Sequence, residues 1–206
     1  MDIPFLIGAF VTLFVIIEPV GLAPLFLSLT RGTEGAERRA IAYRACLMGA
    51  ALLTLFGLLG ETVLNFVGIS MPAFRIAGGI LLFLTALDML FERRTARRKG
   101  QAQTHADPSV FPLATPLIAG PGSMATMILL TGQAETPVGI FWVMMVMVAV
   151  VIVAFMLFLT ANWLERVLGD TGINVVTRLL GMLLAALSVQ FVLDGLASFG
   201  LGTMPG

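Results

Sequence analysis

The fold of this chain is decided by residues 3–29, which read IPFLIGAFVTLFVIIEPVGLAPLFLSL. This stretch is apolar almost throughout and contains one charged side chain, that of Glu18. A helix that crosses the hydrocarbon core of a bilayer needs roughly 20 such residues in succession. Residues 3–29 are therefore predicted to span a membrane. The stretch lacks the basic start and cleavage site of a signal peptide, so we expect it to remain in the mature protein.

Five further stretches of the 206-residue chain meet the same requirement. Six spans occupy nearly the whole sequence and leave no room for a separate soluble domain. The sequence therefore predicts an all-α integral membrane protein with six transmembrane helices. The five stretches are approximately Ala40–Gly60, Pro72–Phe91, Val110–Thr131, Val138–Thr160 and Ile173–Phe199.

The composition supports this class and excludes others. Hydrophobic residues make up 58% of the chain and charged residues 12%, and soluble domains carry about 25% charge. Twelve basic and twelve acidic residues balance, which argues against a nucleic-acid partner, because such partners require a basic face. The single cysteine, Cys46, cannot form an internal disulfide, and we expect it to be a small buried residue. We expect no cofactor and no bound metal.

The basic residues indicate an orientation. If the amino terminus lies outside, the connections after the first, third and fifth spans are cytoplasmic. Those connections and the helix ends beside them contain eleven of the twelve basic residues. The positive-inside rule then predicts an inner-membrane protein with both termini outside and the basic loops in the cytoplasm. The eleven are Arg31, Arg38, Arg39, Arg44, Arg93, Arg94, Arg97, Arg98, Lys99, Arg166 and Arg178.

The longest polar connection, Glu92–Pro108, contains a basic run and the only histidine, His105. We interpret it as a solvated linker with orienting charges, and a contact with anionic lipids is the alternative.

Two weak repeats divide the chain into halves, residues 1–100 and 101–206. The first half ends with the basic linker. Each half holds three predicted spans, so the second half enters the membrane from the opposite side. Such an inverted repeat is the arrangement on which many secondary transporters alternate between two access states. The matching pairs are Pro19 with Pro121 and Ala23 with Ala125, 102 residues apart, and Arg75 with Arg178 and Gly78 with Gly181, 103 apart.

The first and fourth spans are predicted to be broken helices. Prolines remove backbone donors and glycines permit unwound backbone, and both residue types cluster at corresponding places in the two halves. Paired breaks at membrane depth indicate a substrate site near the midplane, and a half-helix that begins near Ser123 would direct its N–H groups at an anion. A simple proline kink without a ligand is the alternative. The candidate site residues are Glu18, Pro19, Gly21, Gly120, Pro121, Gly122 and Ser123.

Glu18 lies near the centre of the first span, where a charged group costs roughly 2.5–3.5 kcal/mol on insertion scales. It is a candidate for proton coupling, for the counter-charge to a substrate amino group, or for a cation ligand beside freed carbonyls. The structural alternative is a carboxyl group held by the backbone donors of the break.

Arg75 and Arg178 lie near mirrored helix ends. They are expected either to reach the headgroups or to hold gates by pairing with acids or carbonyls. Gly78 and Gly181 are expected to permit close helix contact.

Four motifs occur in order along the chain: EPVGLAPLF at residues 18–26, RIAGGI at 75–80, PLATPLIAGPG at 112–122 and RLLG at 178–181. Together they resemble the MarC/SnatA family of six-span inner-membrane proteins of bacteria and archaea. Members of that family have an amide or an acidic residue before the first-span proline, and Glu18 is the acidic version. Where members carry Asn, proton coupling through this position cannot be universal.

The resemblance implies transport of small neutral amino acids such as alanine or glycine, which is described for some members, while others have no settled function. Our leading hypothesis is a secondary carrier that holds the substrate carboxylate at Gly120–Ser123 and the amino group towards Glu18. An ion channel or metal-ion carrier, and a non-transporting scaffold, are the alternatives. A coupling ion, H⁺ or Na⁺, and a homo-oligomer are compatible with this reading. We do not expect an enzyme, because the sequence lacks a His-Glu-x-x-His or Gly-x-Ser-x-Gly motif.

Overall fold

The computed structural model describes residues 3–91, 107–134 and 136–199, and every regular element within them is a helix. Five of the helical stretches are long and apolar enough to cross a membrane, and a sixth is obtained when η1 and α6, bent by 53° at their junction, count as one span. The predicted all-α membrane fold is confirmed. The elements are α1 (Ile3–Ile17), α2 (Pro19–Leu29), α3 (Gly35–Val67), α4 (Met71–Leu90), η1 (Ser109–Ile118), α6 (Pro121–Gln133), α7 (Pro137–Leu159) and α8 (Ala161–Ala197).

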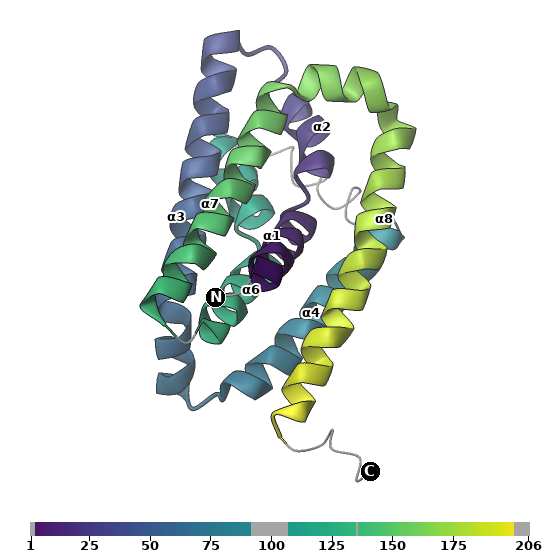
Figure 1. Cartoon of the computed structure of the whole chain (residues 1–206). Helices are drawn as coiled ribbons and strands as arrows, with labels where there is room; N and C mark the ends of the chain where they lie inside the picture. Colours follow the sequence, from purple (N-terminus) through teal and green to yellow (C-terminus); the bar gives the residue numbers. More distant parts are fainter. Residues whose placement is uncertain (1–2, 92–106, 135, 200–206) are drawn as a thin grey trace.

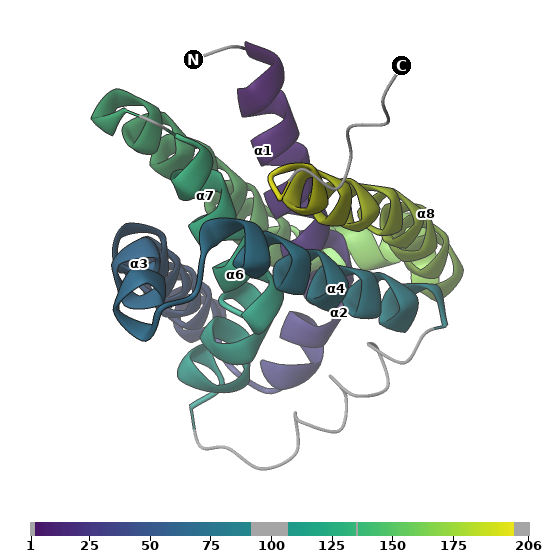
Figure 2. The same cartoon turned by 90° about the horizontal axis from the view of Figure 1, so that it is seen from below.

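The helices form three layers (Figures 1 and 2). The broken spans, α1–α2 and η1–α6, lie in the middle, with α3 and α7 on one side and α4 and α8 on the other. The principal helix pairs join the first half of the chain to the second, so that α3 packs on η1, α6 and α7, and α4 packs on α6 and α8. The two halves are therefore interlocked within one core.

Glycines set the closest helix approaches. Gly60 of α3 faces Ile128 of α6 so closely that a Cβ atom at this glycine would collide with that side chain. A Cβ atom at Gly57 would meet the ends of Met144 in α7 and Met127 in α6. A Cβ at Gly79 of α4 would lie 2.8 Å from the carbonyl oxygen of Ser188 in α8. Small residues thus permit the closest helix contacts in the fold.

The second span is longer than predicted. We expected Ala40–Gly60, whereas α3 runs from Gly35 to Val67 and ends where Gly68 adopts a left-handed conformation with φ of 82°. The reason is that hydropathy marks only the part of a helix inside the hydrocarbon, and no helix breaker interrupts the polar turn before it. The first turns of α3 carry Arg38, Arg39 and Arg44.

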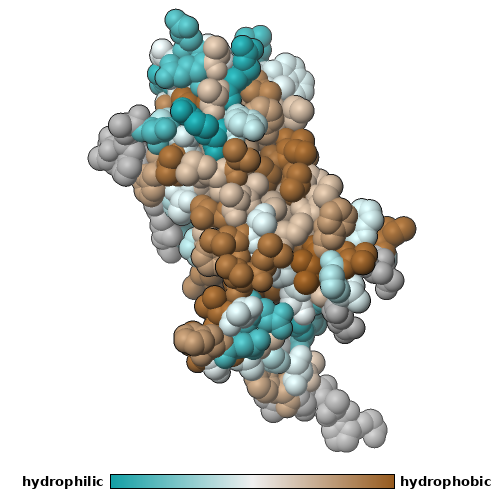
Figure 3. All heavy atoms as spheres, turned by 90° about the vertical axis from the view of Figure 1, so that its left-hand side faces the viewer, coloured by the Kyte–Doolittle hydropathy of each residue, from teal (hydrophilic) through white to brown (hydrophobic). Residues whose placement is uncertain are grey.

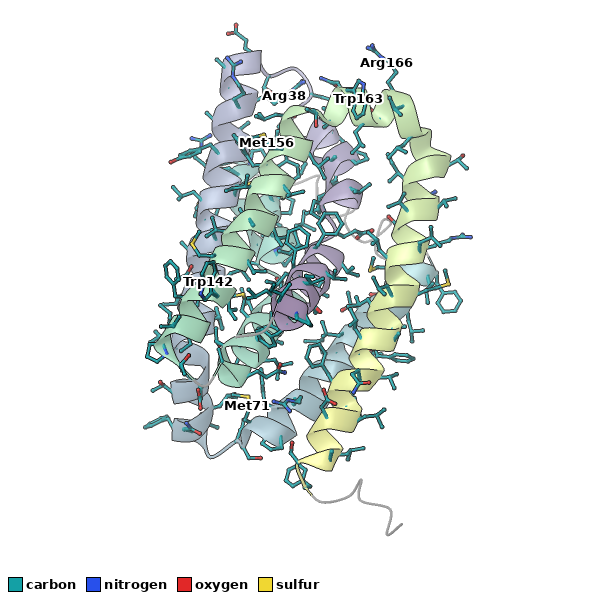
Figure 4. The ribbon with its side chains drawn as sticks, viewed as in Figure 1. Arg38, Met71, Trp142, Met156, Trp163 and Arg166 are labelled. Atoms are coloured by element: carbon teal, nitrogen blue, oxygen red, sulfur yellow. The ribbon has the colours of Figure 1, made fainter. Side chains whose placement is uncertain are left out.

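The last helix begins earlier than the predicted Ile173, at Ala161. Gly169, with φ of 60°, divides it into residues 161–168, which lie across the top of the molecule in Figure 1, and a long membrane-crossing part. Trp163 is 62% exposed on the short part. Trp163 and Arg166 lie at the same end of the molecule as Arg38 in Figure 4, and we call this the basic end. Tryptophan and arginine at one level are typical of the membrane interface.

The surface has the banding that a bilayer requires. In Figure 3 an apolar zone separates hydrophilic patches near the two ends of the molecule. Large apolar side chains are exposed within the spans, among them Leu55, Phe83, Trp142, Ile152 and Leu179. Lipid contact explains their exposure, since hydrocarbon tails are as apolar as these side chains.

Candidate functional site

The first span breaks at Glu18. This residue has a left-handed backbone, with φ of 56° and ψ of 58°, and its side chain is 1% exposed. Pro19 accounts for the break, because proline disfavours an α conformation in the residue before it and has no N–H to continue the hydrogen-bond ladder. A left-handed conformation at a residue other than glycine costs on the order of 1–3 kcal/mol and is typical of functional sites.

The Glu18 side chain folds back over the first turn of α2. Its Oε1 atom lies 2.7 Å from the position that a Cβ atom of Gly21 would occupy. Gly21 therefore provides the space in which the carboxyl group rests. The start of a helix is a favourable place for such a group, because the peptide dipoles and free N–H groups stabilise negative charge there. Pro24 lies inside α2, and the helix continues through it to Leu29.

The fourth span breaks at Gly120, and α6 begins at Pro121, two residues before Ser123. The backbone N–H of Gly120 donates to Ser123 Oγ at 2.9 Å, and the Ser123 hydroxyl lies 2.7 Å from the Ile118 carbonyl oxygen, to which it donates. Ser123 is 3% exposed. Before the break, η1 is irregular, with extended backbone at Phe111 and Thr115. Both predicted breaks are thus present.

The two inner helices begin in the same way but with exchanged side chains. At the residue before each helix, α2 has Glu18 and α6 has Gly120; proline is the first helical residue of both; at the third position α2 has Gly21 and α6 has Ser123. The start of α2 is thus accompanied by a carboxyl group of the chain itself. At the start of α6 the corresponding residue is Gly120, which has no side chain, so no carboxyl group of the chain lies over the first turn there.

The backbone donors at the start of α6 are only partly used. Pro121 has no N–H, the Gly120 N–H bonds Ser123, and the Met124 N–H donates to the Gly120 carbonyl oxygen at 2.9 Å. Within the described part of the chain, the N–H groups of Gly122 and Ser123 have no backbone acceptor. Two adjacent free donors at a helix start form a site for an anion.

The two breaks lie close together in the middle layer. A Cβ atom at Gly122 would lie 2.8 Å from Cδ1 of Ile16, two residues before Glu18, and 3.4 Å from Leu82 of α4. Pro121 is exposed, whereas Gly122 and Ser123 are buried. The start of α6 therefore lies between the core and the accessible surface, with the Ile16 side chain across it.

Sequence reasoning missed Thr126, one turn further along α6. Its side chain is fully buried, and its hydroxyl has no hydrogen-bond partner. Most threonines in apolar helices donate their hydroxyl to their own backbone, and nothing in the sequence distinguishes Thr126 from them. Its role could therefore not be predicted from the sequence.

The two candidate gate residues, Arg75 and Arg178, and the two candidate packing glycines, Gly78 and Gly181, lie along α4 and α8. These helices are antiparallel, because Gly195 faces Ile76 while Gly181 faces Met89. Arg75 and Arg178 therefore lie towards opposite ends of the pair.

Arg75 is half-buried, and its Nε atom has no hydrogen-bond partner, whereas Arg178 is exposed. Gly78 faces Leu129 of α6, and its neighbour Gly79 makes the close contact with α8. The gating role of Arg75 and Arg178 stays a prediction. His105 and the basic run before it lie outside the described residues. Within the described ranges, no three His, Cys, Asp or Glu side chains gather in a way that suits a metal ion.

Comparison with known proteins identifies the family. Residues 3–199 match the family described as MarC family integral membrane proteins. The chain belongs to the MarC family. It is 38% identical over 196 residues to a membrane protein of Aquifex aeolicus, covering 92% of this chain and 91% of that one.

Two MarC relatives come from Escherichia coli K12. The membrane protein YhcE is 35% identical over 210 residues, covering 100% of this chain and 96% of YhcE. The protein named inner membrane protein YhgN is 34% identical over 194 residues, covering 93% and 95%. No solved structure matches the chain. These similarities establish a multi-pass membrane protein of the MarC family, embedded in a lipid bilayer.

Proposed function

We propose that this MarC protein is a secondary carrier of a small neutral amino acid such as alanine or glycine. The observation that carries the proposal is the difference between the two helix starts. At α2 the Glu18 carboxyl group lies over the first turn, while at the equivalent place in α6 two N–H donors are free and Gly120 adds no side chain. A substrate carboxylate bound at the start of α6 would occupy the place that corresponds to the Glu18 carboxyl group at the start of α2.

The part of the site around Glu18 suits the ammonium group of a zwitterion. Pro19 and Pro24 have no N–H, so the carbonyl groups of Val15 and Val20 lack their usual helical donors. Together with Glu18 they are acceptors for an ammonium group. Even a Cβ atom at Gly122 would lie 2.8 Å from Cδ1 of Ile16, so the room for a substrate side chain beside this glycine is small, which favours alanine or glycine.

Alternating access would use the inverted repeat. The helix starts match at a separation of 102 residues, and the pairing of α3 with α6 corresponds to that of α7 with α2. We further propose an inner-membrane orientation with the basic end in the cytoplasm and both termini outside. Arg38 and Arg166 support it by sharing one end of the molecule.

The test is uptake or efflux of labelled alanine in proteoliposomes. Gly122→Leu should abolish transport, because a leucine there collides with Ile16 and covers the free donors. Glu18→Gln should reduce transport at least tenfold, since a hydrogen bond to a charged group contributes roughly 1.5–3 kcal/mol. Gly8→Leu is the matched control, because nothing lies within 4 Å of its side-chain position. Normal transport by both site variants, as folded protein, would exclude this site.

A cation carrier is the second candidate, favoured by the position of Glu18 beside the freed carbonyls. It would show cation flux in the same vesicles without any amino acid, and that flux would be lost in Glu18→Gln. Flux of neither kind would leave the scaffold role.

A further inference from the structure

Thr126 differs from the other threonines that the helices bury. Its side chain is 0% exposed, and within the described residues it is the one buried hydroxyl without a hydrogen-bond partner. A helical threonine ordinarily bonds the carbonyl four residues back. Thr12, Thr30 and Thr131 do so, with oxygen–oxygen distances of 2.8–2.9 Å. The Thr126 hydroxyl does not bond the Gly122 carbonyl and so points away from its own helix axis.

The position of this hydroxyl follows from the helix register. Thr126 lies four residues after Gly122, hence one turn along the same face of α6, the face that meets Ile16 of α1 and Leu82 of α4. Side chains of a helix lean towards its amino-terminal end. Thr126 therefore lies one turn from the start of α6, on the face where the N–H groups of Gly122 and Ser123 have no backbone acceptor.

An unpartnered buried hydroxyl is unfavourable, because burial removes its bonds to water. The other helix start in the middle layer has no counterpart, since residues 23 and 24, which correspond to Thr126, are alanine and proline. Hydroxyl groups therefore accompany only the helix start that lacks a carboxyl group of its own.

We propose that Thr126 is a substrate-binding residue whose hydroxyl donates to the carboxylate of a small zwitterionic substrate, alongside the N–H groups of Gly122 and Ser123. This inference rests on the proposed function and assigns the orientation of the substrate within it. The carboxylate binds to the second half of the chain and the ammonium group faces the first. The Ile16 side chain, whose end lies across Gly122, moves aside when the site fills.

The experiment compares Thr126→Val with wild type, using alanine as the probe. Ligand-dependent thermal stabilisation of purified protein gives the affinity, and proteoliposome transport gives the activity. Because a bond to a charged group is lost, alanine binding should weaken roughly 10- to 100-fold in Thr126→Val. The melting temperature without ligand should stay equal or rise, since the hydroxyl bonds nothing in the empty protein. Thr126→Ser should restore binding.

Thr131→Val is the matched control, because this buried threonine of the same helix bonds the carbonyls of Met127 and Ile128. It should bind alanine like wild type. A Thr126→Val protein that binds and carries alanine normally would overturn the inference and leave the proposed carrier intact, and so would one that melts lower without ligand. Wild-type protein that neither binds nor carries any neutral amino acid would overturn both.

Discussion

Asp107 fixes the entry into η1 through two hydrogen bonds from Ser109. Its Oδ1 atom accepts from the Ser109 N–H at 2.9 Å and from the hydroxyl at 2.6 Å, and Arg44 of α3 lies 4.0 Å away. The Ser109 bonds, with a smaller contribution from Arg44, lower the pKa of Asp107 below its ordinary value of 3.8. One acidic side chain thus holds the chain as it leaves the basic linker.

Asp107→Ala should lower the melting temperature by about 2–4 °C at pH 7, since losing such a cap costs about 1 kcal/mol. The pKa is lowered in the folded state, so this stabilisation is present above the unfolded value and is lost as pH falls through the folded one. Melting curves of wild type and variant should therefore converge below pH 3.8. Arg44→Ala should change little, because its pair with Asp107 is exposed and long. A gap that persists in acid would contradict this account.

At the scale of the element, the contact between α4 and α8 depends on a glycine from each helix. Gly79 lies against the Ser188 carbonyl of α8, and Gly181 lies against the Ala86 carbonyl of α4, 3.4 Å from where its Cβ would be. These two pairs are related by the 102-residue separation that relates the prolines of the breaks. The sequence repeat pairs Gly78 with Gly181, whereas in the packing of α4 on α8 it is Gly79 that corresponds to Gly181.

Gly79→Ala should destabilise the protein by about 1–3 kcal/mol, because the added methyl group meets backbone that cannot move alone. Gly8→Ala in α1 is the control and should be neutral or stabilise by up to about 1 kcal/mol, since it only raises helix propensity. Melting temperatures in one detergent give the comparison. Equal melting temperatures for the two variants would show that α4 and α8 accommodate the added methyl group at no cost in stability.

The sequence predicted what depends on composition and on backbone chemistry, namely the spans and the breaks at Glu18 and Gly120. It did not predict what depends on contacts between distant residues. The surface segment before Gly169, the choice of Gly79 over Gly78 and the unpartnered hydroxyl of Thr126 are all of this second kind. The rule that proline breaks a helix is itself limited, as Pro24 shows. The helix α2 continues through Pro24, whereas α1 ends before Pro19.

At the scale of the whole molecule, Arg38 and Arg166 lie together at the basic end, and by the positive-inside rule this predicts the orientation. Cys46 is buried, so a Cys46→Ala background carrying one new cysteine reports accessibility cleanly. Asn65→Cys lies near the far end of α3 and Glu165→Cys near the basic end, and both positions are exposed. A membrane-impermeant thiol reagent added to intact cells should label Asn65→Cys alone. The reverse pattern would invert the proposed topology.

The interlocking of the two halves has a consequence for how the protein is made. The glycine-lined face of α3 receives side chains only from η1, α6 and α7 among its principal neighbours, and all three are synthesised after it. At roughly 5–20 residues per second, the ~100 residues of the second half take some 5–20 s to emerge. During that time lipid tails must cover the face. The packing of the first three membrane-spanning segments is therefore completed only when the last three have been inserted.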